Sequence, residues 1–165
     1  MKDRLGSEDV IWDLTSLYKD IGDDNIKNDI EYIKRKISLF STKYRKKLNV
    51  ISPGEFLNAI IALEEISQKT SRIGWFAYLN FTRQSNNAQA GAFLQGFEEI
   101  SSQFQKELLF FELEWACLED EAAKPLLENL ALGKSSRCWF PNWHLGALIG
   151  IWWKLGEPRR ESCVS

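Results

Sequence analysis

The side chains best suited to hold a metal ion or to act as nucleophiles lie near the end of this 165-residue chain. His144 is the only histidine. Cys138 precedes it by six residues, and Cys163 follows it by nineteen. Hydrolytic zinc sites commonly place two histidines one helical turn apart, and these cysteine spacings match no common zinc motif. A Cys–His nucleophilic pair would need a helix or strand to fix its geometry, and this segment has no sustained period. The sequence therefore predicts no catalytic residue, no metal ligand and no cofactor in this chain.

A group of carboxylates gathers around one predicted helix boundary: Glu112, Glu114, Glu119, Asp120 and Glu121. Two carboxylates can act as general acid and base when their surroundings separate their pKa values. Helix chemistry accounts for this group more simply. Asp120 fits a helix N-cap and Glu121 the first turn, where negative charge favours the macrodipole. Glu112 and Glu114 flank an apolar stripe, so we expect both to face water and assign neither a catalytic role.

Three shorter motifs suggest ligands without completing a site. The tripeptide Gly-Lys-Ser at 133–135 resembles the end of a phosphate-binding loop, but Glu128 stands where the loop needs its first glycine. A small basic group at 43–47 falls at a predicted helix end, where cations offset exposed carbonyl groups. Nucleic-acid binding needs more positive charge and stacking aromatics, so we expect no nucleic-acid partner. Asn80-Phe81-Thr82 has the form of a glycosylation acceptor, which matters only in a secreted protein.

Composition places the chain among single soluble domains. It is 44% hydrophobic and 27% charged with a net charge of −2, which supplies no basic field for nucleic acid or acidic lipid. Three cysteines form no disulfide framework and suit a reducing compartment. The first ten residues carry Lys2, Asp3, Arg4, Glu8 and Asp9, so they lack the apolar core of a secretory signal. We therefore expect a cytoplasmic protein.

Helical periods dominate the chain as far as Leu132. The first predicted helix spans about 24–45, with an apolar face at Ile26, Ile30, Ile33, Ile37, Phe40 and Tyr44. Its other face is expected in water and carries Lys27, Asp29, Glu31, Lys34, Arg35 and Lys36. A second helix is predicted to begin at Pro53, after a capping box formed by Ser52 and Glu55. We expect it to break near Gly74 and to end in the polar turn 83–87.

The third predicted helix carries the strongest signal and spans about 30 residues. Its stripe repeats at steps of three and four residues through Phe93, Phe97, Ile100, Phe104, Leu108, Phe111, Trp115 and Leu118. Rings this large need partner helices to cover them. A shorter helix is predicted over 119–132, with Pro125 near its start and Leu126, Leu127 and Leu130 turned inward. Nothing resembles a series of strands, so we predict an all-α fold, an antiparallel array of long helices built as helical hairpins.

The composition changes after Leu132, and we predict two parts, a helical domain over 1–132 and an irregular Trp-rich tail over 133–165. Lys and Arg number 16 against 21 Asp and Glu in the first part, but 5 against 2 in the second. Four of the seven tryptophans lie in the tail. The stretch 139–153 is too short to span a bilayer, which needs about 20 apolar residues. Two alternatives are open for this stretch. It adsorbs at a membrane interface, or it is an exposed tail prone to aggregation.

Five segments of the first part resemble the N-terminal region of the oligoendopeptidase F group of M3 metallopeptidases. They are WDLTSLY at 12–18, FSTKYRKKL at 40–48, SPGEFLNAIIALEEI at 52–66, WFAYL at 75–79 and LFFELEW at 109–115. The resemblance covers about residues 9–132. It implies a helical region that precedes a larger helical catalytic domain, in which zinc held through an HExxH motif cleaves oligopeptides. No catalytic or zinc-binding residue of the family has a counterpart in this sequence.

The resemblance implies that this chain is a truncated, channel-walling portion of such an enzyme and is inactive alone, with the missing catalytic domain as its natural packing partner. A reading-frame change in the gene would account for the different tail, which would then be out of frame. Two alternatives stay open. One is a stand-alone helical interaction module whose aromatic stripe binds a partner helix and whose Trp-rich tail docks to a membrane or protein. The other is a regulatory part of a split peptidase.

Overall fold

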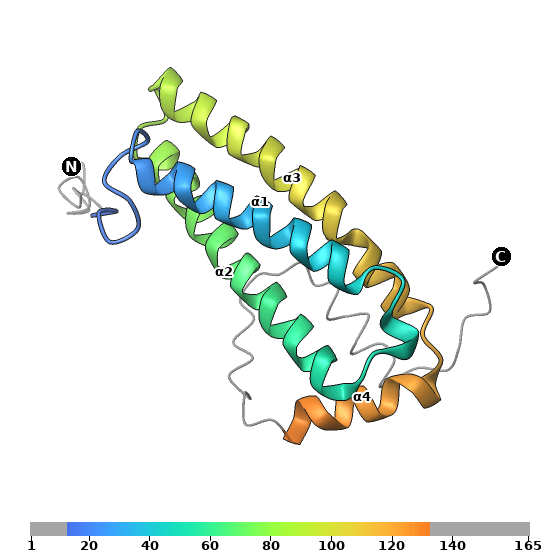
Figure 1. Cartoon of the computed structure of the whole chain (residues 1–165). Helices are drawn as coiled ribbons and strands as arrows, with labels where there is room; N and C mark the ends of the chain where they lie inside the picture. The colour runs from blue at the N-terminus through green and yellow to red at the C-terminus, as the bar shows by residue number, and fades with distance from the viewer. Residues whose placement is uncertain (1–12, 133–165) are drawn as a thin grey trace, which may run out of the picture.

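Four α-helices and one short 3-10 turn make up the part of the chain that the computed structural model describes, residues 13–132, with side chains as far as Glu128. The helices are α1 (Asp24–Tyr44), α2 (Pro53–Arg83), α3 (Ala88–Ala116) and α4 (Asp120–Leu132), with η1 (Leu48–Val50) between the first two. Figure 1 shows α1, α2 and α3 side by side in alternating directions, with α4 across one end. The predicted all-α antiparallel array is confirmed.

Short polar side chains, Asp23, Ser52 and Asn87, begin the three long helices. Asp23 accepts a hydrogen bond from the backbone N–H of Asn25 at 2.9 Å and so begins α1. Ser52 Oγ accepts from Glu55 N at 3.3 Å, and Glu55 accepts in return from Ser52 N at 3.4 Å. This reciprocal pair is the predicted capping box, and it fixes the start of α2. The starts of these helices are therefore fixed by hydrogen bonds between residues close together in the sequence.

Aromatic rings from all three long helices form the core. The largest fully buried side chains are Phe56, Phe76, Ile33, Ile37, Ile66 and Ile73. Phe56 of α2 stacks on Trp115 of α3 with ring centroids 5.0 Å apart, and Phe40 of α1 lies 5.3 Å from Phe111. The predicted stripe of α3 is confirmed, since its members are buried or packed against this core. Burial of each such ring contributes about 1.5–3 kcal/mol.

Two predicted boundaries are wrong. α2 continues without a break through Gly74, because Ile73, Phe76 and Ala77 around it are fully buried and outweigh the roughly 1 kcal/mol that a helical glycine costs. At the start of α4, Asp120 is the first helical residue rather than the N-cap. The carbonyl of Glu119 accepts from Ala122 N at 3.0 Å and Ala123 N at 2.9 Å, so Glu119 takes the N-cap position that was predicted for Asp120.

The outer face of α1 is less exposed than predicted at two positions. The side chains of Asp29 and Lys36 were expected in water, but they are only 16% and 34% exposed. Both are covered because α2 packs along this edge of α1 and brings its own charged residues to them. Periodicity within one helix could not reveal this, since the partners lie 40 and 29 residues away in the sequence.

Candidate functional site

Most residues that the sequence singled out for chemistry fall outside the described part of the chain. His144, Cys138 and Cys163 lie there, as do the tripeptide at 133–135 and the stretch 139–153. The predicted inward position of Leu130 is also outside the described side chains. Within residues 13–132 no group of three or more His, Cys, Asp or Glu is arranged to hold a metal ion. In the same range, no helix is long and apolar enough to cross a membrane.

The acidic residues near the end of α3 do not form a paired carboxylate site. Glu114 accepts a hydrogen bond from the backbone N–H of Lys46 at 2.7 Å and thereby ties the end of α1 to α3. Glu112 lies at the edge of an open groove between α2 and α3. Both side chains are partly covered, although we expected them to face water. Glu119 and Asp120 begin α4. These carboxylates serve different local roles.

The basic group at 43–47 serves helix termination and packing. The Arg45 guanidinium lies 4.2 Å from the centroid of the Phe110 ring and donates to the carbonyl of Glu107 at 3.4 Å. Lys43 lies over the Tyr44 ring at 5.0 Å. Lys46 has a left-handed backbone with φ of 61°, and its N–H bond to Glu114 holds that conformation. The Arg45 side chain and the Lys46 backbone therefore join the end of α1 to α3.

The glycosylation-like tripeptide lies inside α2. Asn80 is buried, with 7% of its surface exposed, and its side-chain oxygen accepts from Arg83 at 3.4 Å. A glycosyl group attached there would have to displace the helix packing around it. The position therefore has a structural role in the described fold.

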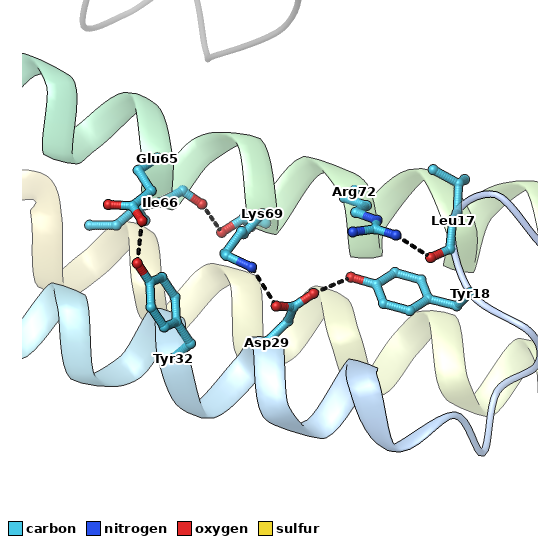
Figure 2. A network of polar contacts seen from close by, with 9 residues as sticks. Leu17, Tyr18, Asp29, Tyr32, Glu65, Ile66, Lys69 and Arg72 are labelled. Carbon is cyan, nitrogen blue, oxygen red and sulfur yellow. Dashed lines mark hydrogen bonds and ion pairs between the residues drawn. The ribbon is translucent and has the colours of Figure 1, made fainter.

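A network of polar side chains joins α1, α2 and the segment before α1, and we call it the polar seam (Figure 2). Asp29 accepts from Tyr18 Oη at 2.8 Å and from Lys69 Nζ at 2.6 Å. Arg72 donates to the carbonyl of Leu17 at 2.7 Å, and its guanidinium lies 4.9 Å from the centroid of the Tyr18 ring. A second branch one turn along α1 consists of Tyr32 and Lys36, both bonded to Glu65.

Hydrogen bonds and neighbouring charges keep the Asp29 carboxylate of the polar seam ionised. Burial alone would raise the pKa of Asp29, but the hydrogen bonds from Lys69 and Tyr18, together with the charges of Lys69 and Arg72, hold that pKa below its usual value. Burial and the bond to Asp29 raise the pKa of the Tyr18 phenol. Each donor in the seam therefore has an acceptor, and the seam offers no free group for catalysis. Its geometry is that of a structural clamp between helices.

A groove runs between α2 and α3 on the side away from α1. Its volume is about 310 Å³, and it is lined by Ile66, Thr70, Ser71, Gly74, Phe97, Ser101, Phe104, Gln105, Leu108, Leu109 and Glu112. The floor is apolar because α2 and α3 turn the outer edge of the core toward it. No residue of α1 lines it, and no Lys or Arg is among the lining residues. The groove is therefore a candidate contact surface for another molecule.

The sequence contained a sign of this groove in apolar residues that lie outside the buried stripe of α3. Leu109 and Leu113 are apolar but lie off the buried stripe of α3, and they are 46% and 59% exposed. On α2, the large side chains of Trp75 and Tyr78 are likewise 48% and 54% exposed. Apolar residues outside a helix's core stripe indicate a second contact face. Of these four residues Leu109 lines the groove, so its place off the core stripe of α3 could have predicted this face.

Comparisons of the chain with known protein families, with curated proteins and with solved structures give no match. The resemblance to oligoendopeptidase F therefore stays a prediction.

Proposed function

We propose that this chain is the N-terminal helical portion of an oligoendopeptidase F-like zinc metallopeptidase, where it walls the channel that admits oligopeptides. The observation that carries the proposal is where the resembling segments lie in the fold. Tyr18 of the first segment is 2% exposed and enters the polar seam, Ser52 of the third caps α2, and Phe111 and Trp115 of the last form the aromatic core. The resembling residues are thus the ones that hold the helices together.

In this proposal the chain contributes shape, and the chemistry belongs to a separate catalytic part. With His144 as its only histidine, the sequence contains no HExxH motif. Zinc in the family activates a water molecule for peptide hydrolysis. The catalytic part would pack against the helices described here, and a cytoplasmic location belongs to the same proposal because the cysteine content favours a reducing compartment.

The proposal is tested by complementation. The purified chain is mixed with a separately produced catalytic part of an oligoendopeptidase F, and cleavage of a fluorogenic oligopeptide is followed with and without a chelator. We expect no cleavage by the chain alone and a chelator-sensitive gain of activity over the catalytic part alone in the mixture. Chelator-sensitive cleavage by the purified chain alone would contradict the proposal. Translation of the downstream DNA in the other two frames adds a second test, because it should show an HExxH-bearing continuation.

A second candidate is a stand-alone helical interaction module, and the groove between α2 and α3 favours it. Such a module would unfold cooperatively and would be a monomer or a defined oligomer without any added part. An orphaned portion of a larger enzyme would instead bind hydrophobic dyes and aggregate, because its contact face is uncovered. Sedimentation velocity and urea unfolding of the full chain separate the two. A regulatory part of a split peptidase is distinguished by regained activity on mixing.

A further inference from the structure

The chain before α1 forms a strap, residues 13–22, at the end of the helical array opposite α4 (Figure 1). Two of its side chains are buried, Leu14 at 7% and Tyr18 at 2% exposure. Leu17 and Ile21 are partly buried against the same core. The long helices supply most of the other buried side chains and pack on one another. Apolar burial therefore holds the strap less firmly than it holds the helices together.

The backbone of the strap forms local turns. Leu17 N and Tyr18 N both donate to the carbonyl of Leu14, at 2.9 Å and 3.1 Å. Gly22 N donates to the Asp20 carboxylate at 2.7 Å. In the described part of the chain, no backbone–backbone hydrogen bond links residues 13–22 to a helix. Detachment of the strap therefore breaks no backbone bond of any helix.

The N-terminus of α1 has a cap that does not depend on the strap. Asp23 Oδ1 accepts from Asn25 N at 2.9 Å and from Asn25 Nδ2 at 2.8 Å. The other carboxylate oxygen, Oδ2, accepts from Lys19 N of the strap at 3.0 Å. Since the cap and the strap use different oxygens, loss of the strap bond leaves the cap bonds in place. We therefore expect α1 to stay helical from its first turn when the strap detaches.

Two helix side chains, Asp29 of α1 and Arg72 of α2, hold the strap through hydrogen bonds (Figure 2). Tyr18 Oη donates to Asp29 at 2.8 Å. Arg72 donates to the carbonyl of Leu17 at 2.7 Å and to that of Ser16 at 3.4 Å. Its guanidinium also lies 4.9 Å from the centroid of the Tyr18 ring. We call Asp29 and Arg72 the latch, because within residues 13–132 no other helix side chain makes a hydrogen bond to the strap.

Both charges of the latch stay satisfied when the strap is away. Lys69 Nζ donates to the Asp29 carboxylate at 2.6 Å, and this bond joins α1 to α2 without the strap. Arg72 is exposed, so its guanidinium is solvated once Leu17 has left. A charge left buried without a partner would make detachment very unfavourable, and neither residue is left in that state. The open form therefore loses the contacts of the strap and little else.

The second branch of the polar seam contains no residue of the strap. Tyr32 donates to Glu65, and Lys36 Nζ donates to the same carboxylate at 2.8 Å. All three residues belong to α1 and α2. This branch therefore joins the two helices in the closed and the open form alike, and it provides a control for the latch.

We infer that residues 13–22 form a latched strap, which detaches from the helices while α1, α2, α3 and α4 stay folded, with Asp29 and Arg72 as its latch. Detachment removes the Tyr18 ring from the Phe76 ring, whose centroid lies 5.3 Å away, and uncovers apolar surface at this end of the bundle. Phe76 also contacts Phe93 of α3, with ring centroids 6.1 Å apart. The strap thus covers one side of an aromatic contact between α2 and α3. The inference uses only described residues and holds with or without the metallopeptidase proposal.

Limited trypsin digestion of the full chain, followed by mass spectrometry, measures detachment. Lys19 is an exposed residue of the strap, and Lys34 is exposed in the middle of α1. Each cleavage rate is divided by the rate for a synthetic peptide with the same residues around the site. We expect the normalised rate after Lys19 to exceed that after Lys34 at least about tenfold, because cleavage follows the population of the locally open form.

Two matched tyrosine variants separate the latch from the rest of the seam. Tyr18→Phe removes only the hydroxyl that bonds Asp29, so it should raise the rate after Lys19 at least about threefold. Tyr32→Phe removes the hydroxyl that bonds Glu65. It destabilises the closed and the open form equally, so it should raise the rate after Lys34 but change the rate after Lys19 less than about twofold.

Arg72→Gln tests the other half of the latch. It loses the bond to the Leu17 carbonyl and the contact with the Tyr18 ring, so it should raise the rate after Lys19 at least about fivefold. Circular dichroism checks that each variant keeps its helix content before the rates are compared.

Three results would overturn the inference. A normalised rate after Lys19 that does not exceed the rate after Lys34 would show that the strap opens only when α1 unfolds. Equal acceleration after Lys19 by Tyr18→Phe and Tyr32→Phe would show the same, since both bonds would then be lost in a single step. An unchanged rate after Lys19 in Tyr18→Phe or in Arg72→Gln would show that the latch does not hold the strap.

Discussion

The two sides of α2 differ in the kind of contact that they make. Toward α1, the polar seam joins the helices through directional bonds, and Asp29 and Glu65 each receive two donors from outside their own helices. Toward the groove, α2 and α3 leave an apolar floor with Glu112 at its edge and no ion pair to any described residue at that carboxylate. On the seam side the polar side chains are paired with one another within the described residues. On the groove side the lining is mostly apolar, and its composition is that of a contact surface.

The comparison separates what fixes the fold from what is left for function. Polar bonds between helices specify register, because a shift by one turn would leave a buried donor or acceptor unpaired at a cost of about 1–3 kcal/mol. An apolar groove imposes no such register and tolerates partners that differ in detail. Variants on the seam side should therefore change stability, whereas exposed variants on the groove side should change mainly binding.

The largest effect is expected for Phe76→Ala. Phe76 is 1% exposed, and its ring lies 5.3 Å from the Tyr18 ring below the seam. Removing the ring leaves a cavity that well-packed helices fill poorly, so we expect a loss of about 3–5 kcal/mol in the free energy of unfolding. Tyr78→Ala on the same helix is the control, because Tyr78 is 54% exposed and should cost less than about 1 kcal/mol. Urea unfolding measures both, and similar losses would refute the division of α2 into two sides.

The second effect is expected for Asp29→Ala, which leaves the Tyr18 hydroxyl and the Lys69 ammonium without their shared acceptor. The expected cost is about 1–3 kcal/mol, since both donors stay partly buried. Glu31→Ala is a control on the exposed face of the same helix and should leave the unfolding midpoint nearly unchanged.

The same carboxylate predicts a dependence on pH. Its pKa is lowered in the folded state, so its contribution is present above the unfolded pKa of about 3.9 and is lost as pH falls through the folded pKa. The difference in stability between the native chain and Asp29→Asn should therefore shrink below about pH 4. A difference that stays constant down to pH 2 would show that Asp29 is not held ionised by the seam.

A smaller effect of opposite sign is expected at the groove for Gly74→Ala. A β-carbon at this position would lie 3.4 Å from Phe97 Cε1, which is ordinary contact, and alanine is the better helix former. We expect a gain of about 0.5–1 kcal/mol in the free energy of unfolding. Gly96→Ala on α3 is the matched control, since a β-carbon there meets nothing within 4 Å and gives the helix propensity alone. A loss at Gly74 but not at Gly96 would show that the α2–α3 contact tolerates no added carbon.

Local signals predicted the helices well, because each depends on residues close together in the sequence. The stripe of α1 from Ile26 to Tyr44, the capping box at Ser52 and the aromatic stripe of α3 all follow from spacings of three or four residues. The break expected at Gly74 failed because a glycine's intrinsic preference is weaker than the burial of the residues around it. Propensity is thus decisive mainly where packing is absent.

Tertiary pairing could not be predicted in the same way. Asp29 appears on a solvated face until Lys69, 40 residues later, is known to lie beside it. The groove depends on which apolar residues remain uncovered after α1 has packed. The period of a single helix cannot predict which residues those are. Exposed Leu109 and Leu113 give a partial signal, because they fall outside the core stripe of α3. Apolar side chains that stay exposed are then distinguishable from core only once the third helix is placed.

The smallest effect is expected for Glu64→Gln, because the pH behaviour of Glu64 should be opposite to that of Asp29. Burial raises the pKa of Glu64, so the folded chain holds its proton more tightly than the unfolded chain. Stability must then fall as pH rises from the unfolded pKa of about 4.3 through the raised folded value, and the penalty stays at neutral pH. Glu64→Gln removes the charge, so it should be slightly more stable than the native chain at pH 7 and equal to it at pH 3, whereas Asp29→Asn should be less stable at pH 7. Urea unfolding at both pH values measures the pair, and a loss of stability for Glu64→Gln at pH 7 would mean that this carboxylate already has a cationic partner.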